Sequence, residues 1–181
     1  MNYLDKIGFQ DISQFQVDFD IKYSTTDNFV QQKIYDQDFK MLHKDAALRL
    51  ENATLYAKTL GYKIKIFDAF RPISAQRKMW NIVQNPDYVS NPDTGPCCHC
   101  RGIAIDLTLT KDDIEIDMGS EFDFFGGLSH HDSKDITNKQ RESRIILAGI
   151  MSISGFCSIR TEWWHYQLPN YQNYEKIEYN P

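Results

Sequence analysis

One acidic residue lies in the middle of the most apolar strand-like segment of the chain. The run 103–109 alternates as a β-strand does, and Asp106 stands at its centre among isoleucine, alanine and leucine side chains. Burying a carboxylate costs free energy unless a charge or hydrogen-bond donors compensate for it. The chain must therefore fold so that a basic side chain such as Arg101, or a bound metal ion, reaches Asp106.

Two histidines offer the further ligands that a metal ion at this strand would need. His99 follows a loop rich in proline and glycine, and Asp106 lies seven residues further on, with Gly102 between them. His165 lies among aromatic residues, which exclude water and strengthen electrostatic interactions at a metal. Two imidazoles and one carboxylate form a three-ligand set of the kind that leaves a coordination position open for water in hydrolytic zinc sites. The sequence predicts one Zn²⁺ ion per chain, held by His99, Asp106 and His165.

Two charged residues near these segments are candidates for catalysis. Glu162 precedes His165 by three residues. The tryptophans that follow it would raise the pKa of its carboxyl toward the range that a general base requires, which makes an ordinary surface carboxylate the less favoured interpretation. Arg71 ends a strand-like segment and either forms a structural salt bridge with Asp68 or stabilises negative charge on a tetrahedral intermediate. The pattern leaves both interpretations of Arg71 open. The pair 130–131, two adjacent histidines, is expected to have a structural or surface role.

Three of the four cysteines, Cys97, Cys98 and Cys100, surround His99. Thiolate ligation of a metal is an alternative, but structural zinc sites use ligand pairs about two to four residues apart and a second such pair. In a strand, Cys98 and Cys100 would also point to the face opposite His99. Cys157 has no partner in the sequence and is predicted to be a small core residue. This clustering differs from a disulfide framework and favours reduced thiols and a cytoplasmic location.

Composition excludes several classes of function. A chain of 181 residues with 41% hydrophobic residues can bury one core of ordinary size. Its net charge of -5 argues against nucleic acid as a partner, because a protein that binds nucleic acid needs an excess of basic side chains to neutralise the phosphates. No apolar run reaches the roughly 18 residues of a membrane span, and the first residues lack the pattern of a secretory signal. The sequence contains no signal for an oligomeric state.

The hydrophobic pattern predicts an α+β fold with a single domain over residues 1–181, in which helices pack on one side of a mainly antiparallel sheet. A helix is expected over 38–60, where Gly61 supplies the stop, and another over 137–154, where Thr137 and Gln140 form a capping box. The remaining elements are strands at 15–23, 62–70, 103–109, 114–116, 156–159 and 163–168, a short helix at 74–83, and a loop at 84–97.

Motifs along most of the chain occur in the same order as in one known family. They are the segments 23–29 (YSTTDNF), 68–72 (DAFRP), 99–109 (HCRGIAIDLTL), 118–124 (MGSEFDF), 129–131 (SHH) and 162–166 (EWWHY). In these motifs the chain resembles the D-alanyl-D-alanine dipeptidases, a group of zinc peptidases that includes the vancomycin-resistance dipeptidase. The resemblance implies the small α+β fold that this group shares with other zinc D-Ala-D-Ala peptidases and with the hedgehog signalling domain.

The resemblance also implies roles for the residues at matching positions. Zinc would be held by the two histidines and the aspartate identified above, Glu162 would be the catalytic base and Arg71 would stabilise the transition state. Tyr23 and Asp123 fall on positions near the substrate's amino end. Cys97 replaces a serine that contacts the substrate carboxylate in the family, and a thiol is a poorer hydrogen-bond donor than a hydroxyl.

The function predicted from these features is zinc-dependent hydrolysis of the small dipeptide D-alanyl-D-alanine. Two alternatives stay open at this point. One is a D,D-carboxypeptidase that trims peptidoglycan stem peptides, and the other is a zinc-stabilised binding module without catalytic activity. The presence of both Glu162 and Arg71 argues against the binding module.

Overall fold

A six-stranded sheet forms the centre of the molecule in a computed structural model, which describes residues 3–86 and 88–179. Every pair of neighbouring strands in it is antiparallel except β2 and β4, which are parallel. The prediction of a mainly antiparallel α+β fold is therefore confirmed. The strand order is β2 (Val17–Phe19), β4 (Lys63–Asp68), β5 (Ala104–Lys111), β8 (Glu162–Gln167) and β7 (Cys157–Ile159), with β6 (Ile114–Glu115) paired to β5.

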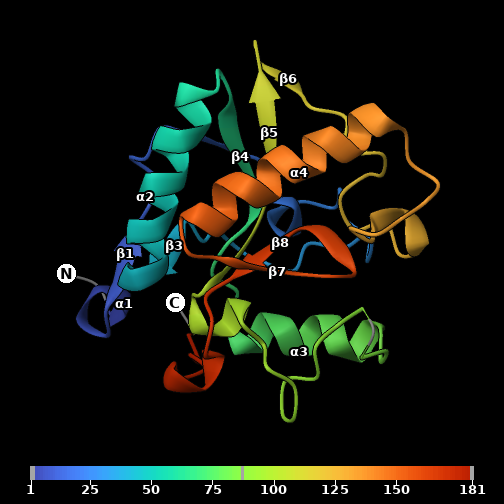
Figure 1. The fold of residues 1–181 in the computed structure, drawn as a ribbon. Helices are drawn as coiled ribbons and strands as arrows, with labels where there is room; N and C mark the ends of the chain where they lie inside the picture. Colours follow the sequence, from blue (N-terminus) through green and yellow to red (C-terminus); the bar gives the residue numbers. More distant parts are fainter. Residues whose placement is uncertain (1–2, 87, 180–181) are drawn as a thin grey trace.

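Two long helices, α2 (Lys44–Thr59) and α4 (Asn138–Ile153), pack against each other and cover one face of the sheet (Figure 1). The buried residues of α2 recur every three or four positions, which gives the helix one apolar face. The helix α3 (Ile73–Ile82) lies apart from this pair, beyond the end of the sheet where β8 and β7 lie in Figure 1. A short helix α1 (Tyr3–Lys6) precedes a two-stranded sheet formed by β1 (Phe9–Asp11) and β3 (Met41–His43).

Two predicted boundaries are wrong. The helix expected over 38–60 begins at Lys44, because residues 41–43 form β3 and the His43 side chain accepts a hydrogen bond from the backbone N–H of Asp45 at the helix start. The strand expected over 15–23 is limited to β2, and the chain turns into a 3-10 helix at Lys22–Ser24. In both segments most apolar residues of the pattern are buried or partly buried, although Leu60 is 56% exposed, so the pattern marked burial and not the extent of an element.

The other predicted elements are confirmed to within one or two residues. Both hydrogen bonds of the predicted capping box at Thr137 and Gln140 are present at the start of α4, and Gly155 follows the end of that helix with a φ of 94°. The described residues of the segment 84–97 contain neither helix nor strand, as predicted.

Gly102 explains how the chain passes from His99 to β5. His99–Arg101 form a 3-10 helix, η2, and Gly102 ends it in the left-handed region with a φ of 65°. A Cβ atom at this position would lie 2.3 Å from the ring of Phe9 and 2.9 Å from the backbone nitrogen of His43. Only glycine fits both the conformation and the space, so this residue fixes the direction in which the chain runs from His99 into β5.

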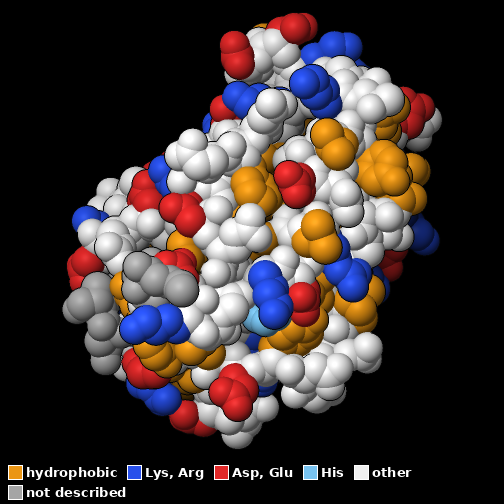
Figure 2. Space-filling model, turned by 90° about the vertical axis from the view of Figure 1, so that its left-hand side faces the viewer, with side chains coloured by type: hydrophobic (Ala, Val, Ile, Leu, Met, Phe, Trp, Pro, Cys, Tyr) orange, Lys and Arg blue, Asp and Glu red, His pale blue; other side chains and the backbone are white. Residues whose placement is uncertain are grey.

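The outer face near α1 and α2 mixes side chains of both charges with separate hydrophobic groups (Figure 2). The exposed hydrophobic residues of α2 include Leu48 and Leu55. None of the helices within residues 3–86 and 88–179 combines the length and apolar character that crossing a lipid bilayer requires.

Candidate metal centre and active site

The register of three strands brings the acidic and imidazole groups together. Asp106 of β5 lies opposite His165 of β8 on one side and opposite Asp68 of β4 on the other. Directly opposite residues in a sheet have Cβ atoms about 5 Å apart, so the three side chains share one face. By the alternation of a strand, this is the face opposite that of Ile105 and Leu107. The apolar context of Asp106 in the sequence thus comes from residues that point the other way.

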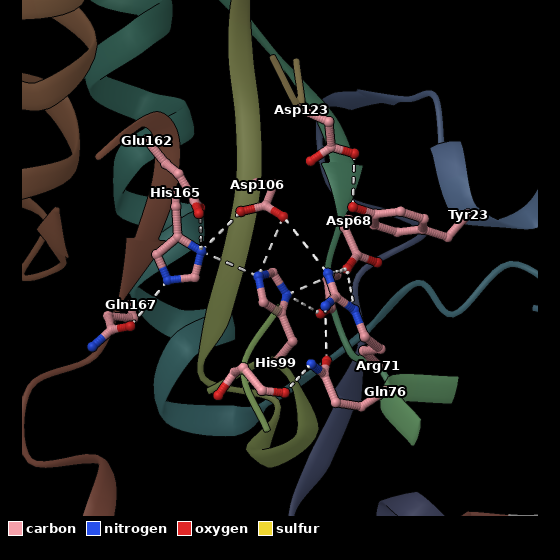
Figure 3. A network of polar contacts seen from close by, with 12 residues as sticks. Tyr23, Asp68, Arg71, Gln76, His99, Asp106, Asp123, Glu162, His165 and Gln167 are labelled. Atoms are coloured by element: carbon pink, nitrogen blue, oxygen red, sulfur yellow. Dashed lines mark hydrogen bonds and ion pairs between the residues drawn. The ribbon is translucent and has the colours of Figure 1, made fainter. Parts of the chain in front are cut away.

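His99 completes the cluster from η2. Its Nε2 atom lies 3.2 Å from Nδ1 of His165 and 3.3 Å from Oδ2 of Asp106, and His165 Nδ1 lies 3.0 Å from Oδ1 of Asp106 (Figure 3). All three residues are buried. Among the residues that the structure describes, this is the one group of three or more histidine, cysteine and acidic side chains whose ligand atoms converge as a metal requires.

The outer ring nitrogens of both histidines have hydrogen-bond acceptors. His99 Nδ1 lies 2.8 Å from the backbone carbonyl of Ala69, and His165 Nε2 lies 3.0 Å from Oε1 of Gln167. A carbonyl oxygen can only accept, so in each neutral ring the proton sits on the outer nitrogen and the inner nitrogen presents a lone pair. Two lone pairs and a carboxylate facing one another call for a cation between them.

The separations within the cluster fit a tetrahedral zinc ion. Zinc bonds of about 2.0–2.1 Å to nitrogen and oxygen place two ligands of a tetrahedron about 3.3 Å apart. The three measured separations run from 3.0 to 3.3 Å. The donor types, two imidazole nitrogens and one carboxylate oxygen, are those of zinc sites that keep a position for water. The residues present therefore fit a catalytic metal.

The pKa shifts within the cluster also favour a bound cation. Burial alone would raise the pKa of Asp106, but the neighbouring His99 and His165 hold it well below its usual value. Burial would lower the pKa of His165, and its hydrogen bond to Asp106 outweighs this and raises the pKa to about 9. The cluster thus favours a bound positive charge, which a metal ion supplies more strongly than a proton.

Glu162 faces the cluster from the start of β8. Its Oε2 atom lies 3.9 Å from Nδ1 of His165. Residues three apart in a regular strand point to opposite faces, but the pairing of β7 with β8 shifts register between Ser158 and Ile159, beside Glu162. Burial and the charge of Asp106 raise the pKa of Glu162, against the opposing effect of His165. The raised pKa expected from the aromatic neighbours is confirmed in direction.

Arg71 is fixed in a network of hydrogen bonds beside the cluster. Asp68 Oδ2 accepts from Arg71 Nη2 at 2.6 Å and from Nε at 3.1 Å, and Gln76 Oε1 accepts from Nη1 at 2.8 Å. Nη2 also lies 4.0 Å from Oδ2 of Asp106. The structural salt bridge to Asp68 is therefore present, and it aims the guanidinium at the pocket that contains the cluster (Figure 3). The two interpretations of Arg71 do not exclude each other.

Tyr23 and Asp123 form the far wall of this pocket. The Tyr23 hydroxyl donates to Oδ2 of Asp123 at 2.7 Å, and the Arg71 guanidinium lies 4.9 Å from the centre of the Tyr23 ring. Enclosure by the pocket walls raises the pKa of Asp123 well above its usual value, although the bond from Tyr23 acts in the opposite direction. The carboxylate is held with one edge directed at the pocket (Figure 3).

Cys97 lies in the pocket wall with a φ of 45° and directs its thiol to the carbonyl of Asn91 at 3.2 Å. The expectation that Cys98 and Cys100 would point away from His99 in a strand does not apply, because His99–Arg101 form the 3-10 helix η2. One prediction about the other cysteines is wrong. Cys157 is exposed at the start of β7 and is not a core residue. All four cysteines are free thiols.

One pocket of about 340 Å³ contains every residue that the sequence singled out for the site. These are Tyr23, Arg71, Cys97, His99, Asp106, Asp123, Glu162 and His165. A larger hollow of about 630 Å³ borders residues 115–122 and includes Thr108 and Gln140, but the convergent metal-ligating group lies in the smaller pocket. Chemistry, and not size, identifies the site.

Two supporting residues were missed in the sequence. Gln167 accepts from His165, and Gln76 holds Arg71 while its own amide donates to the carbonyl of Ser90 at 2.7 Å. Gln167 had a usable signal, since it lies two positions after His165 on the same face of a strand. Gln76 had none, because a single glutamine in a helix has no distinctive spacing. The pair 130–131 lies outside the ligand group, and the carbonyl of His130 accepts a hydrogen bond from Arg144.

Comparison with known proteins places this chain in a family. A family model described as D-ala-D-ala dipeptidase matches residues 5–180. A D-alanyl-D-alanine dipeptidase of Escherichia coli K12 is 36% identical over 159 residues, which cover 87% of this chain and 82% of the relative. Dipeptidases of the same name from Enterococcus faecalis and Enterococcus faecium are 35% and 32% identical, covering 84% and 90% of this chain and 86% and 92% of the relatives. The chain belongs to the D-Ala-D-Ala dipeptidase family of metallopeptidases.

Proposed function

We propose that this chain is a zinc-dependent hydrolase of D-alanyl-D-alanine in which Glu162 is the general base. The observation that carries the proposal is the convergence of His99, Asp106 and His165 at 3.0 to 3.3 Å, with the Glu162 carboxylate 3.9 Å from His165. The family and the printed names of its relatives support a dipeptide as substrate. We also propose that residues 1–181 act as one catalytic domain, and that its free cysteines suit a cytoplasmic location.

His99, Asp106 and His165 would hold the zinc ion. When bound, zinc supplies an acidified water and a Lewis acid for the scissile carbonyl. Glu162 accepts the proton of the attacking water and passes it to the departing amine, a role that its raised pKa favours. Arg71, held by Asp68 and Gln76, places a fixed positive charge where the carbonyl oxygen becomes negative. Because these hydrogen bonds exist before substrate binds, little reorganisation is required during the reaction.

The remaining pocket residues fit the two ends of a free dipeptide. Asp123, oriented by Tyr23, offers a carboxylate to the substrate's ammonium group. Cys97 lies in the pocket wall on the loop before η2, where it would contact the substrate carboxylate. A pocket of about 340 Å³ is at the small end of the range for ligand sites, which suits a dipeptide. A carboxylate reserved for a free amine argues against the carboxypeptidase alternative, because a stem peptide has no amine at that position.

The thiolate-ligated metal site gains no support, since the convergent ligand group contains no cysteine among the described residues. A zinc-stabilised binding module would have no use for Glu162 and Arg71 facing the same pocket. Catalysis accounts for both residues.

The proposal is tested by measuring alanine release by the zinc-loaded protein from D-Ala-D-Ala, N-acetyl-D-Ala-D-Ala and L-Ala-L-Ala. We expect turnover of the free D,D-dipeptide alone, loss of activity after treatment with a chelator, and recovery on addition of zinc. Equal or faster cleavage of the acetylated substrate would favour the carboxypeptidase. Bound zinc without turnover of any of the three peptides would contradict an enzymatic role.

A further inference from the structure

The segment Cys97-Cys98-His99-Cys100 places two thiols at the ends of one tight turn. The backbone N–H of Cys100 donates to the carbonyl of Cys97 at 3.0 Å. A turn closed in this way keeps its first and last Cα atoms within about 7 Å, and disulfides need a Cα separation of about 4.4–6.8 Å. The turn therefore has the dimensions of a disulfide-forming pair.

The two thiols differ in how a reagent reaches them. Cys97 lines the pocket of the metal centre, so a small molecule that enters the pocket meets its sulfur. Cys100 is fully buried behind it, with 0% of its surface exposed. The intervening Cys98 also borders the pocket, but it packs into the hydrophobic core and does not close the turn. This is the arrangement of an attacking and a resolving cysteine: the thiol that lines the pocket, on a residue with 4% of its surface exposed, is oxidised first, and the thiol behind it then reacts with it.

We propose that Cys97 and Cys100 form an intramolecular disulfide in the pocket wall when the protein meets hydrogen peroxide. In the first step, the Cys97 sulfur attacks one peroxide oxygen, the O–O bond breaks, and the hydroxide released takes the thiol proton to become water. In the second step, the Cys100 sulfur attacks the sulfenic sulfur of Cys97, the S–S bond forms, and the S–O bond breaks. The oxygen leaves as water with the Cys100 proton. The two thiols lose two electrons and the peroxide is reduced to two waters.

The disulfide changes the pocket itself. It removes the thiol that points at the Asn91 carbonyl, so the loop before η2 loses a hydrogen bond. It also closes a ring around the turn that contains His99. The effect on catalysis rests on the proposed function, and we expect turnover of D-Ala-D-Ala to fall on the order of a hundredfold, the loss typical of an ångström-scale misplacement near the reacting groups. The oxidation itself does not depend on that function.

The experiment treats the zinc-loaded protein with hydrogen peroxide, alkylates the remaining thiols under denaturing conditions and maps peptides by mass spectrometry. We expect two alkylated cysteines, 98 and 157, and one cross-linked peptide that joins 97 to 100. Dithiothreitol should restore four alkylated cysteines and, if the proposed function holds, activity. The Cys100→Ser variant should instead trap a sulfenic acid at Cys97 that a cyclic 1,3-dione labels. The Cys157→Ser variant, changed at an exposed thiol on β7, should form the disulfide as the parent protein does.

Three results would overturn the inference. One is a full set of four alkylatable thiols after peroxide treatment, and another is a disulfide that joins a different pair. The third is conversion of Cys97 directly to sulfinic acid in the parent protein. Each of these three results is read from a peptide mass and not from an activity. The disulfide can therefore be tested even in a protein that proves inactive on D,D-peptides. Should Cys100→Ser fail to fold, Cys100→Ala and the peptide map of the parent protein decide the point.

Discussion

At the scale of single residues, Asp123 shows the cost of building a binding site. Its carboxylate is half-buried, and enclosure raises its pKa well above the usual value in spite of the hydrogen bond from Tyr23. A carboxyl group whose pKa is higher in the folded state than in the unfolded state stabilises the fold only while it is protonated. As pH rises through the folded pKa, this contribution is lost. In this chain, the charge that we propose for recognition of the substrate's amine therefore lowers stability at neutral and alkaline pH.

Replacing Asp123 with asparagine should separate the two effects. At pH 8 the Asp123→Asn variant should have a free energy of unfolding about 1 kcal/mol higher than that of the parent protein, and it should therefore unfold at a higher temperature. The difference should shrink as pH falls and the parent carboxyl takes up its proton. Asparagine also tolerates the φ of 58° at this position.

Two measurements check this prediction, thermal unfolding between pH 5 and 8 and the KM for D-Ala-D-Ala. The Asp117→Asn variant, at a carboxylate on the protein surface whose pKa is lowered by hydrogen bonds from Gln140 and Gly119, is the matched control and should not gain stability with rising pH. A variant at position 123 that is less stable than the parent at pH 8 would show that the carboxylate is compensated in the folded protein.

The residues that could be predicted are those whose chemistry restricts their environment. A carboxylate in an apolar strand, two histidines and a glutamate followed by two tryptophans each had few acceptable surroundings, and the structure brings them into one pocket. Gln76 and Gln167 could not be predicted with equal force, because an uncharged amide is acceptable almost anywhere. The error at Cys157 has the same origin, since a small side chain is accepted both in a core and at a strand edge.

At the scale of elements, periodicity predicted which residues are buried better than it predicted where elements begin. The alternation at 15–23 and the helical spacing at 38–60 both continued past the real ends of β2 and α2. The start of α2 was decided by the pairing of β3 with β1, and the end of β2 by the local hydrogen bonds of the 3-10 helix at Lys22–Ser24. Residues typical of helix ends predicted boundaries more accurately, and the capping box at the start of α4 lies at the residues that the sequence predicted.

The capping box gives a direct test at this scale. The Thr137→Ala variant loses the side-chain oxygen that accepts from the backbone N–H of Gln140, so we expect a loss of about 1 kcal/mol and a melting temperature lower by roughly 2–4 °C. Circular dichroism during heating measures it.

The control for the cap is Thr59→Ala at the end of α2, whose hydroxyl bonds to the carbonyl one turn earlier, at Leu55. This change should be close to neutral. Equal losses in both variants would show that threonine content, and not the cap, determines the effect.

At the scale of the whole molecule, the candidate metal centre joins three separate parts of the chain. One ligand comes from η2, one from β5 and one from β8, and the strand register aligns two of them. This long-range register is the part of the site that sequence spacing could not supply, because it depends on how β5 pairs with both of its neighbours. An ion that binds the folded arrangement and not the unfolded chain stabilises the entire fold.

Zinc should therefore raise the melting temperature of the metal-free protein. At a free zinc concentration about a hundred times the dissociation constant, the expected gain is about 3 kcal/mol. The Asp106→Asn variant should lose most of this gain, whereas His130→Gln, at a histidine outside the ligand group, should keep it. Differential scanning calorimetry with and without zinc makes the comparison, and an equal zinc response in all three proteins would place the metal elsewhere.

The most direct test of the whole account is the Glu162→Gln variant, measured for zinc content and for turnover of D-Ala-D-Ala. The amide keeps the shape of the side chain but cannot accept the water proton, and the three proposed zinc ligands are untouched. We predict one zinc ion per chain, as in the parent protein, and a loss in kcat of at least about a hundredfold. Turnover close to that of the parent protein, with zinc still bound, would contradict the assignment of Glu162 as the base and the mechanism built on it.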